Sequence, residues 1–298
     1  MIQDIYPHKF DNQYKKPLPK PQDYLLVFEN TDMYMYLEGD KERLPTYEQV
    51  CTEFPQAQDK IHASGKLQII YLFSVDEKKF FLGLHLKMHD TKHLVKRNIQ
   101  MFRELQPSWC GFAGITGHQL YKWYSDHVYC GRCAHPMSHK EDERALKCAK
   151  CGQIEYPKIS PAIIVGVIKD NKILMSKYAN RENKRYALLA GFSEIGETLE
   201  ETVKREVMEE VGVKVKDITY YKNQPWAFSE SLLVGFFARL EGSDKITLDE
   251  TELEMANWFE RKDIPKNDLT ISLTAEMIET FRQNKVVFKT KESPYQKP

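Results

Sequence analysis

The sequence has no excess of charge of either sign and no long apolar stretch. Lys+Arg and Asp+Glu each number 43, so the formal net charge of the 298 residues is zero. This balance gives no electrostatic footprint for tight, nonspecific nucleic-acid binding. No apolar run approaches the roughly 20 residues of a transmembrane helix. The first five residues have neither a basic start nor an apolar segment, so we expect no secretory signal and a cytoplasmic protein.

What remains is the composition of an ordinary globular protein, with 42% hydrophobic and 29% charged residues. At roughly 100–200 residues per domain, this length predicts two or three domains. We predict an α+β fold in three parts: a strand-rich domain over residues 1–125, a metal-binding ribbon over residues 126–157 and a C-terminal domain over residues 158–298.

The first part offers no catalytic constellation. Residues 1 to about 20, rich in lysine and proline, predict an arm rather than a core element. Apolar runs predict strands at 24–28, 33–37, 67–73 and 79–84, and helical patterns occupy 93–105 and 114–127. His85, His89 and His93 have the spacing of helical metal ligands, but the segment around His85 alternates like a strand end. No cysteine or carboxylate partner accompanies them, so we assign them no metal.

Four of the six cysteines form two close pairs. The spacing is C-x2-C, fourteen residues, C-x2-C, formed by Cys130, Cys133, Cys148 and Cys151. Such pairs place four thiolates around a tetrahedral zinc ion. Four sulfur ligands leave no open coordination position, so we predict a structural zinc that stabilises a segment too short to fold alone. Gly131 and Gly152 stand where the turns of the ribbon need a permissive backbone. The other two cysteines, Cys51 and Cys110, are expected to be buried apolar residues.

The third part carries the chemistry. Residues 161–168 predict a strand, and the turn at Asp170-Asn171 leads into a second strand at 172–176, which makes a hairpin. Residues 188–197 predict a loop with two glycines. Thr198 is a plausible N-cap for a helix ending near Val211, with Glu201 as its capping-box partner and Gly212 as the C-terminal stop.

That helix carries far more carboxylates than its two basic residues can balance. Leu199, Val203, Val207 and Val211 form an apolar stripe that should pack on a core. Glu206, Glu209 and Glu210 span an arc of about 100° that overlaps the edge of this stripe. Converging carboxylates repel one another unless a divalent cation lies between them, and magnesium suits carboxylate and phosphate oxygens. Glu201 points away from this seam.

The segment is similar to the signature of a known family. It reads Gly191, five residues, Glu197, seven residues, Arg205-Glu206-Val207, one residue, Glu209-Glu210, one residue, Gly212-Val213, which fills every specified position of the Nudix box. The chain therefore resembles the Nudix hydrolases, which cleave nucleoside diphosphates linked to another group. The resemblance implies an α/β/α sandwich for the C-terminal domain. It also implies metal binding by Glu206, Glu209 and Glu210, and bracing of the loop and helix by Arg205 and Glu197.

A second motif narrows the resemblance. Residues 223–231 read N-Q-P-W-A-F-S-E-S, which looks like the S-Q-P-W-P-F-P-x-S signature of the NADH pyrophosphatases, the NAD diphosphatases of the NudC type. Asn223, Ala227 and Ser229 depart from it, and the loss of two prolines should loosen this turn. The order of the parts, with a four-cysteine ribbon before the Nudix domain, is also that of this family.

Further roles follow from the resemblance alone. Glu252 lies where the family places an additional metal-binding glutamate, and Glu254 is the alternative. Tyr156 and Phe192 match aromatic positions that stack on the substrate base. Four further residues match substrate-binding or pocket-lining positions: Gln224, Ser231, Ile164 and Thr274, although the family usually has alanine where Thr274 stands. The family's pocket is completed by a second subunit, which implies a homodimer.

These observations predict an enzyme, a magnesium- or manganese-dependent NAD(+) diphosphatase that splits NAD(H) into AMP and nicotinamide mononucleotide. Removal of a 5′ NAD cap from RNA would be the same chemistry. Glu210 is our candidate for the general base, and a metal-bound hydroxide is the alternative. Two other functions stay open: a Nudix pyrophosphatase that prefers ADP-ribose or dinucleoside polyphosphates, and a nucleotide- or RNA-binding module without turnover.

Overall fold

The computed structural model describes residues 1–57, 68–179, 186–266 and 271–288. The chain divides into two compact units, one of residues 2–158 and one of residues 159–298 together with Met1. We describe each unit by itself. No helix in the described ranges has the length and apolar character that crossing a membrane requires.

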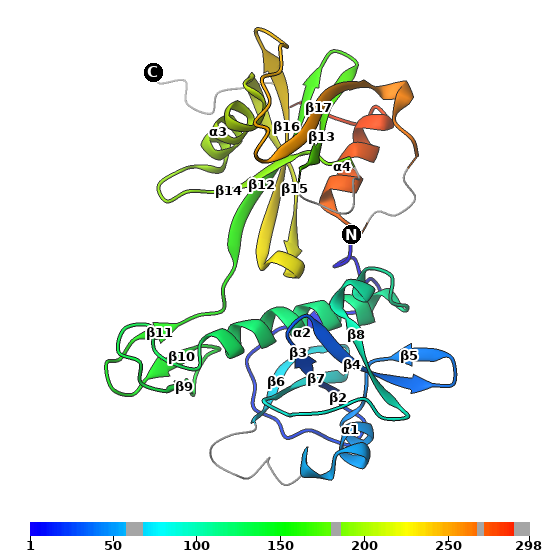
Figure 1. The fold of residues 1–298 in the computed structure, drawn as a ribbon, viewed down its shortest axis with the longest axis vertical. Helices are drawn as coiled ribbons and strands as arrows, with labels where there is room; N and C mark the ends of the chain where they lie inside the picture. The colour runs from blue at the N-terminus through cyan, green and yellow to red at the C-terminus, as the bar shows by residue number, and fades with distance from the viewer. Residues whose placement is uncertain (58–67, 180–185, 267–270, 289–298) are drawn as a thin grey trace, which may run out of the picture. The chain divides into compact units, whose positions relative to one another are not determined.

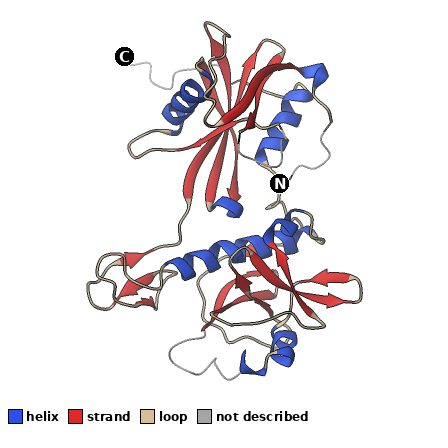
Figure 2. Cartoon of the chain, in the orientation of Figure 1, coloured by secondary structure: helices blue, strands red, loops and turns tan. Residues whose placement is uncertain are grey.

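The first unit contains two four-stranded sheets and one long helix (Figures 1 and 2). One sheet has the order β1-β6-β7-β2, and in the other β4 pairs with β3, β5 and β8. Its strands are β1 (Phe10–Asp11), β2 (Tyr24–Leu26), β3 (Phe28–Glu29), β4 (Asp32–Glu38), β5 (Lys41–Arg43), β6 (Gln68–Val75), β7 (Lys78–Leu84) and β8 (Leu94–Asn98). Its helices are α1 (Tyr47–Glu53) and α2 (Ser108–Asp126), with short 3-10 segments η1 (Pro55–Ala57) and η2 (Ile99–Arg103).

The strands predicted at 24–28, 33–37 and 79–84 are present in this unit, and the run at 67–73 is a strand from Gln68 onward, since residue 67 lies outside the described residues. The helix predicted at 93–105 is wrong. Residues Leu94–Asn98 form a strand that pairs with β4, and η2 follows it. The sequence pattern does not indicate this strand, because its partner lies about sixty residues earlier in the chain. The helix predicted at 114–127 starts six residues sooner, at Ser108. The arm is largely irregular but contributes β1 to a sheet edge.

The metal ribbon is a small three-stranded sheet at the end of this unit. Its strands are β9 (Met137–His139), β10 (Leu146–Cys148) and β11 (Ile154–Glu155), with β10 in the centre. Each strand has only two or three residues, so the sheet itself buries little apolar surface. Cys51 and Cys110, outside the ribbon, are buried as expected.

The second unit is built on a six-stranded mixed sheet. The order is β15-β16-β12-β13-β17, and β14 pairs with β12. The strands are β12 (Ser160–Lys169), β13 (Lys172–Tyr178), β14 (Leu189–Phe192), β15 (Lys214–Trp226), β16 (Ser231–Glu241) and β17 (Leu253–Glu260). The helices are α3 (Leu199–Val211) and α4 (Leu273–Arg282), with η3 (Ala227–Ser229) and η4 (Arg261–Asp263). The hairpin predicted through Asp170 is present as the antiparallel pair β12–β13.

Helices α3 and α4 cover opposite faces of this sheet (Figure 1). On the α3 face, Val203, Val207 and Val211 pack against valines and isoleucines of β12 and its neighbours. On the α4 face, Leu273, Met277 and Phe281 pack against Ile164 and other residues of the same strands. Both faces of the sheet are therefore buried, which confirms the predicted α+β class and the α/β/α sandwich.

The predicted loop at 188–197 is partly a strand. Residues Leu189–Phe192 pair with β12, with Ala190 opposite Ile164 and Gly191 opposite Ile163. Between β14 and α3, the irregular part is limited to residues 193–198. This short connection sets β14 directly beside the start of α3.

Candidate functional site

The ends of α3 are fixed by the residues that the sequence indicates. Thr198 is the N-cap, and it forms a complete capping box with Glu201, whose carboxylate accepts the Thr198 amide at 2.8 Å. Gly212 closes the helix in the left-handed conformation, with φ of 69°. Three of the four residues of the apolar stripe, Val203, Val207 and Val211, are fully buried, so the helix cannot rotate without exposing them. The glutamates on the adjoining face are thus held in fixed directions.

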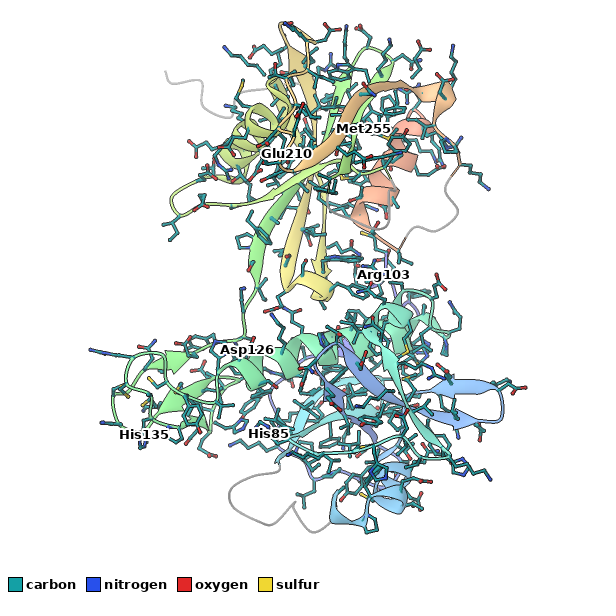
Figure 3. All side chains as sticks on the ribbon, viewed as in Figure 1. His85, Arg103, Asp126, His135, Glu210 and Met255 are labelled. Carbon is teal, nitrogen blue, oxygen red and sulfur yellow. The ribbon has the colours of Figure 1, made fainter. Side chains whose placement is uncertain are left out.

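Glu210 is buried between α3 and the sheet (Figure 3). Its side chain is 2% exposed, and neither carboxylate oxygen has hydrogen-bonding geometry with any described residue. Burial, together with the charges of Glu206 and Glu252, raises the pKa of Glu210 to about 8. The nearby backbone of Ala190 opposes this shift in part. A buried carboxylate without a partner is costly, so the site calls for a cation or a proton.

Glu206 lies directly over β14. A Cβ atom on Gly191 would stand 1.9 Å from Cδ of Glu206, so only glycine leaves room for this carboxylate. Burial is the main cause that raises the pKa of Glu206, and the neighbouring charges of Glu209 and Glu252 add to it. The glycine of the motif is therefore required by close approach.

Arg205 connects the helix to the preceding loop. Its Nε donates to Glu197 at 2.6 Å, and its Nη2 donates to the carbonyl oxygen of Phe192 at 2.9 Å. Its Nη1 donates to Glu206 at 2.8 Å and to Glu209 at 2.9 Å. These ion pairs lower the pKa of Glu197 to about 2 and raise that of Arg205. This arrangement is the one that a bracing role for Arg205 and Glu197 needs.

The remaining predicted carboxylates differ in exposure. The side chain of Glu209 is 58% exposed and reaches the site through Arg205. Glu252 is exposed in the turn before β17, and its charge contributes to the pKa shifts of both Glu206 and Glu210. This proximity favours Glu252 over Glu254. Glu201 is used by the capping box and stays outside the site.

The sequence pattern does not reveal three further contributors. Thr202 donates to Glu197 at 2.9 Å, and its position on the helix could have indicated this contact. Asp249 donates its backbone amide to the carbonyl oxygen of Glu210 at 3.0 Å, and its charge also raises the pKa of Glu210. Ala190 lies beside Glu210 on β14. The last two contacts join segments distant in sequence, so no local signal announces them.

The candidate pocket residues lie on three strands, β12, β15 and β16, and on α4. Ile164 is buried in the core on the α4 face, and Thr274 is half-buried in the first turn of α4. Ser231 is buried, with its hydroxyl donating to the carbonyl oxygen of Ser229 at 3.0 Å. Gln224 is completely buried, and both ends of its amide bond the start of α4.

The two aromatic candidates are exposed, as a stacking surface must be. Phe192, at the end of β14, is 55% exposed, and its backbone carbonyl is held by Arg205. Tyr156, after β11 in the other unit, is also 55% exposed. Its hydroxyl donates to Glu143 at 3.1 Å. Both rings are free to take a planar ligand within their own units.

The four ribbon cysteines form a metal-binding cluster. Their Sγ atoms all lie within 4.8 Å of one another, and the cluster is the one group of this kind in the described ranges. Two of the separations, Cys130–Cys151 and Cys133–Cys148, are 3.6 and 3.5 Å. Four sulfurs at about 2.3 Å from a tetrahedral zinc would be about 3.8 Å apart. The thiols therefore fit structural zinc.

One prediction about the ribbon backbone is wrong. Gly152 has the expected positive φ of 76°, but in the first knuckle the left-handed residue is Ala134, with φ of 56°, and not Gly131. Ala134 and Gly152 each directly follow the second cysteine of their pair. Their amides donate to the carbonyl oxygens of Cys130 and Cys148, so the two knuckles turn in the same way.

A different observation, the unpartnered carboxylate of Glu210, indicates that the glutamates of α3 suit a hard divalent cation. They are more spread out than the thiols, because Arg205 holds an oxygen each of Glu206 and Glu209. The unpartnered oxygens of Glu210 and the adjacent charges of Glu206 and Glu252 provide the donor set that magnesium or manganese prefers. Glu206, Glu209, Glu210 and Glu252 are the residues that would hold such an ion.

Comparison with known proteins agrees with the Nudix box and with the four-cysteine ribbon. Residues 158–281 match the family model of the NUDIX domain, and residues 125–156 match that of the NADH pyrophosphatase zinc ribbon domain. The chain therefore contains a Nudix domain and a zinc ribbon of the NADH pyrophosphatase type, which confirms the predicted resemblance. Nudix hydrolases use magnesium or manganese, and a ribbon with four cysteines carries structural zinc, as predicted.

Curated relatives cover part of the chain. A protein named NAD-capped RNA hydrolase NudC from Salmonella schwarzengrund is 44% identical over 149 residues, and one of the same name from Escherichia coli K12 is equally similar. The match spans 50% of this chain and 58% of each relative. A crystal structure of a NUDIX hydrolase from Nitrosomonas europaea is 23% identical, with a TM-score of 0.45, over 52% of this chain and 90% of that one.

Proposed function

We propose that this chain, which combines a Nudix domain with a zinc ribbon of the NADH pyrophosphatase type, hydrolyses the pyrophosphate of NAD(H). The products are AMP and nicotinamide mononucleotide, one water being consumed. The observation that carries the proposal is the buried, unpartnered carboxylate of Glu210 beside Glu206 and Glu252. The names of the relatives support an extension to the 5′ NAD cap of RNA, where the same bond is cleaved.

The side chains of the site divide the work in this proposal. Glu206, Glu209, Glu210 and Glu252 hold the divalent cation, which when bound neutralises pyrophosphate charge and acidifies water. Arg205 keeps Glu206 and Glu209 in place through its 2.8 and 2.9 Å contacts. Glu210 is also the candidate general base, and burial raises the pKa of its carboxyl to about 8 when no cation is bound. Phe192 supplies an exposed aromatic face on the Nudix unit for the substrate base.

Product analysis tests this proposal directly. The purified protein is incubated with magnesium or manganese and with NAD, NADH, ADP-ribose, diadenosine tetraphosphate or an NAD-capped RNA, and the products are separated by chromatography. We expect AMP and the mononucleotide to form fastest from NAD or NADH, or the capped RNA to lose its cap. Faster cleavage of ADP-ribose or the tetraphosphate would overturn the proposed selectivity. Nucleotide binding without cleavage would support a module that binds and does not turn over.

The main reason to test ADP-ribose and diadenosine tetraphosphate is the sequence of the segment that ends β15 and leads into β16. Two of the three residues that depart from the signature, Ala227 and Ser229, lie in η3 between β15 and β16, and the third, Asn223, lies in β15. Ser229 contacts Ser231 there, with 3.0 Å between their hydroxyl oxygens. A proline at position 229 would lack the hydroxyl that makes this contact, and a proline at either position would lack a backbone N–H. The product analysis with several substrates tests whether this altered turn changes the selectivity.

We also propose a homodimer in the cytoplasm. Exposed apolar side chains on the Nudix unit support an interface, since Ile159, Phe192 and Ile195 are 65%, 55% and 104% exposed. A thiol cluster that holds zinc is typical of a reducing compartment. Light scattering coupled to size exclusion would give about twice the mass of 35.0 kDa for a dimer. A monomer mass at micromolar concentration would contradict it.

A further inference from the structure

Gln224 is completely buried, whereas a side chain that contacts substrate needs some exposure. It lies near the end of β15, opposite Leu233 of β16, and its exposed fraction is 0%. Its Nε2 donates to the carbonyl oxygen of Ile271 at 3.0 Å, and its Oε1 accepts the amide of Leu273 at 2.7 Å. Both ends of the side-chain amide therefore bond main-chain atoms at the start of α4.

These two bonds lie on either side of Ser272, at the entry to the first turn of α4. Ser272 is the N-cap of the helix, and its hydroxyl accepts the amide of Ala275 at 3.3 Å. Thr274 stands between Leu273, which Gln224 holds, and Ala275, which Ser272 holds. The position of Thr274 thus depends on Gln224 from the strand and on Ser272 within the helix.

The chemistry of the side chain is specific to this task. An amide donates and accepts at the same time, as a carbonyl and an N–H side by side require. Leucine offers neither group, and an ionised glutamate offers only acceptors. A buried main-chain group that loses its partner is destabilised, so the turn should shift or loosen when Gln224 is replaced.

We propose that Gln224 is a positioning residue that holds the first turn of α4, and with it Thr274, in the conformation that binds the dinucleotide. This role rests on the proposed function. It replaces the direct substrate contact that the resemblance implies for Gln224. Three of the four proposed metal-binding glutamates lie on α3, on the opposite face of the sheet from α4, so the role concerns substrate affinity rather than the hydrolytic step.

Steady-state hydrolysis of NAD by the full-length, zinc-loaded protein with magnesium gives the first test. We expect Gln224→Leu, which removes both bonds, to raise KM by about tenfold or more, with kcat within about threefold of wild type. Ser272→Ala loosens the same turn without touching Gln224 and should raise KM similarly. Because both act through one turn, the double variant should show less than the product of the two effects.

Tyr221→Phe is the matched control. The Tyr221 hydroxyl contacts the side chains of Glu276, at the end of the first turn, and Thr280, at 2.9 Å each, so its loss leaves the main-chain bonds of Gln224 at the start of α4 in place. We expect its KM to equal that of wild type. Gln224→Glu adds a second reading: only the protonated carboxyl can donate to Ile271, so its KM should approach the wild-type value as pH is lowered.

Amide hydrogen exchange of the nucleotide-free proteins separates positioning from direct contact. We expect faster exchange at residues 273–276 in Gln224→Leu than in wild type, before any substrate is added. A raised KM with unchanged exchange would mean that Gln224 touches substrate, and an unchanged KM would mean that it has no role in binding; either overturns the inference. If wild type does not hydrolyse NAD, the proposed function has failed, which differs from an active wild type with a normal Gln224→Leu variant.

Discussion

At the scale of single residues, the environment of Glu210 favours the protonated form of its carboxyl. In the unfolded chain its carboxyl has a pKa near 4.3, whereas burial raises the pKa to about 8 in the fold. The folded state therefore binds the proton more tightly, so its contribution to stability is complete below about pH 4.3 and is lost as pH rises towards 8. We expect the Tm of the metal-free protein to fall between pH 5 and 8, and magnesium to restore it at pH 8.

Thermal unfolding followed by circular dichroism measures this effect. Glu210→Gln should flatten the pH dependence of Tm, because the amide does not titrate. Glu209→Gln is the control: that side chain is 58% exposed and should leave the slope unchanged. Equal slopes in wild type and Glu210→Gln would refute the assigned cause.

Catalysis gives a second prediction for the same residue. If Glu210 holds the cation or accepts the proton of the attacking water, Glu210→Gln should lower kcat by about 10²–10⁴ while the fold persists. Glu200, exposed on the first turn of α3, supplies a matched substitution, Glu200→Gln, with kcat expected to stay normal. Rates from the NAD assay, with circular dichroism as the check on folding, decide it. Near-normal turnover in Glu210→Gln would remove its role.

At the scale of the element, β14 and α3 pack so closely that a residue of the strand determines where a glutamate of the helix can lie. Gly191 lets the carboxylate of Glu206 lie over the strand, because a Cβ would stand 1.9 Å from Glu206 Cδ. Gly191→Ala should therefore displace Glu206, weaken magnesium binding by more than tenfold and lower turnover. Gly131→Ala, where a Cβ would meet nothing within 4 Å, should change neither. Magnesium titration of activity measures both variants, and unchanged affinity in Gly191→Ala would contradict the packing argument.

Local signals explain which elements the sequence predicts well. The ends of α3 depend on residues within one turn, Thr198 with Glu201 and then Gly212, and both were predicted correctly. Strands β8 and β14 were missed because each is defined by a distant partner, β4 and β12. The fate of Gln224 has the same cause. The resemblance implies a substrate contact for Gln224, but the bonding partners of its side chain lie nearly fifty residues later, at the start of α4.

At the scale of the whole molecule, two kinds of metal site serve different purposes. The Nudix unit has two extensive apolar cores around its sheet and can fold on them. The ribbon in the other unit has strands of two or three residues, with Leu146 and Ala145 among its few buried apolar side chains. Zinc at the four thiolates must therefore supply much of the ribbon's folding free energy. This difference predicts that losing zinc affects the ribbon first.

Cys148→Ser tests this dependence on zinc. The Cys148 side chain is fully buried in the cluster, so serine removes a ligand where water cannot easily replace it. We expect the variant to lose its one zinc per chain, measured by mass spectrometry of the metal, and to unfold the ribbon at lower temperature. Cys110→Ser makes the same substitution at a buried cysteine outside the cluster and should keep its zinc. Full zinc content and unchanged Tm in Cys148→Ser would refute the ribbon assignment, since a tetrathiolate site with one ligand removed should not retain its metal at equal affinity.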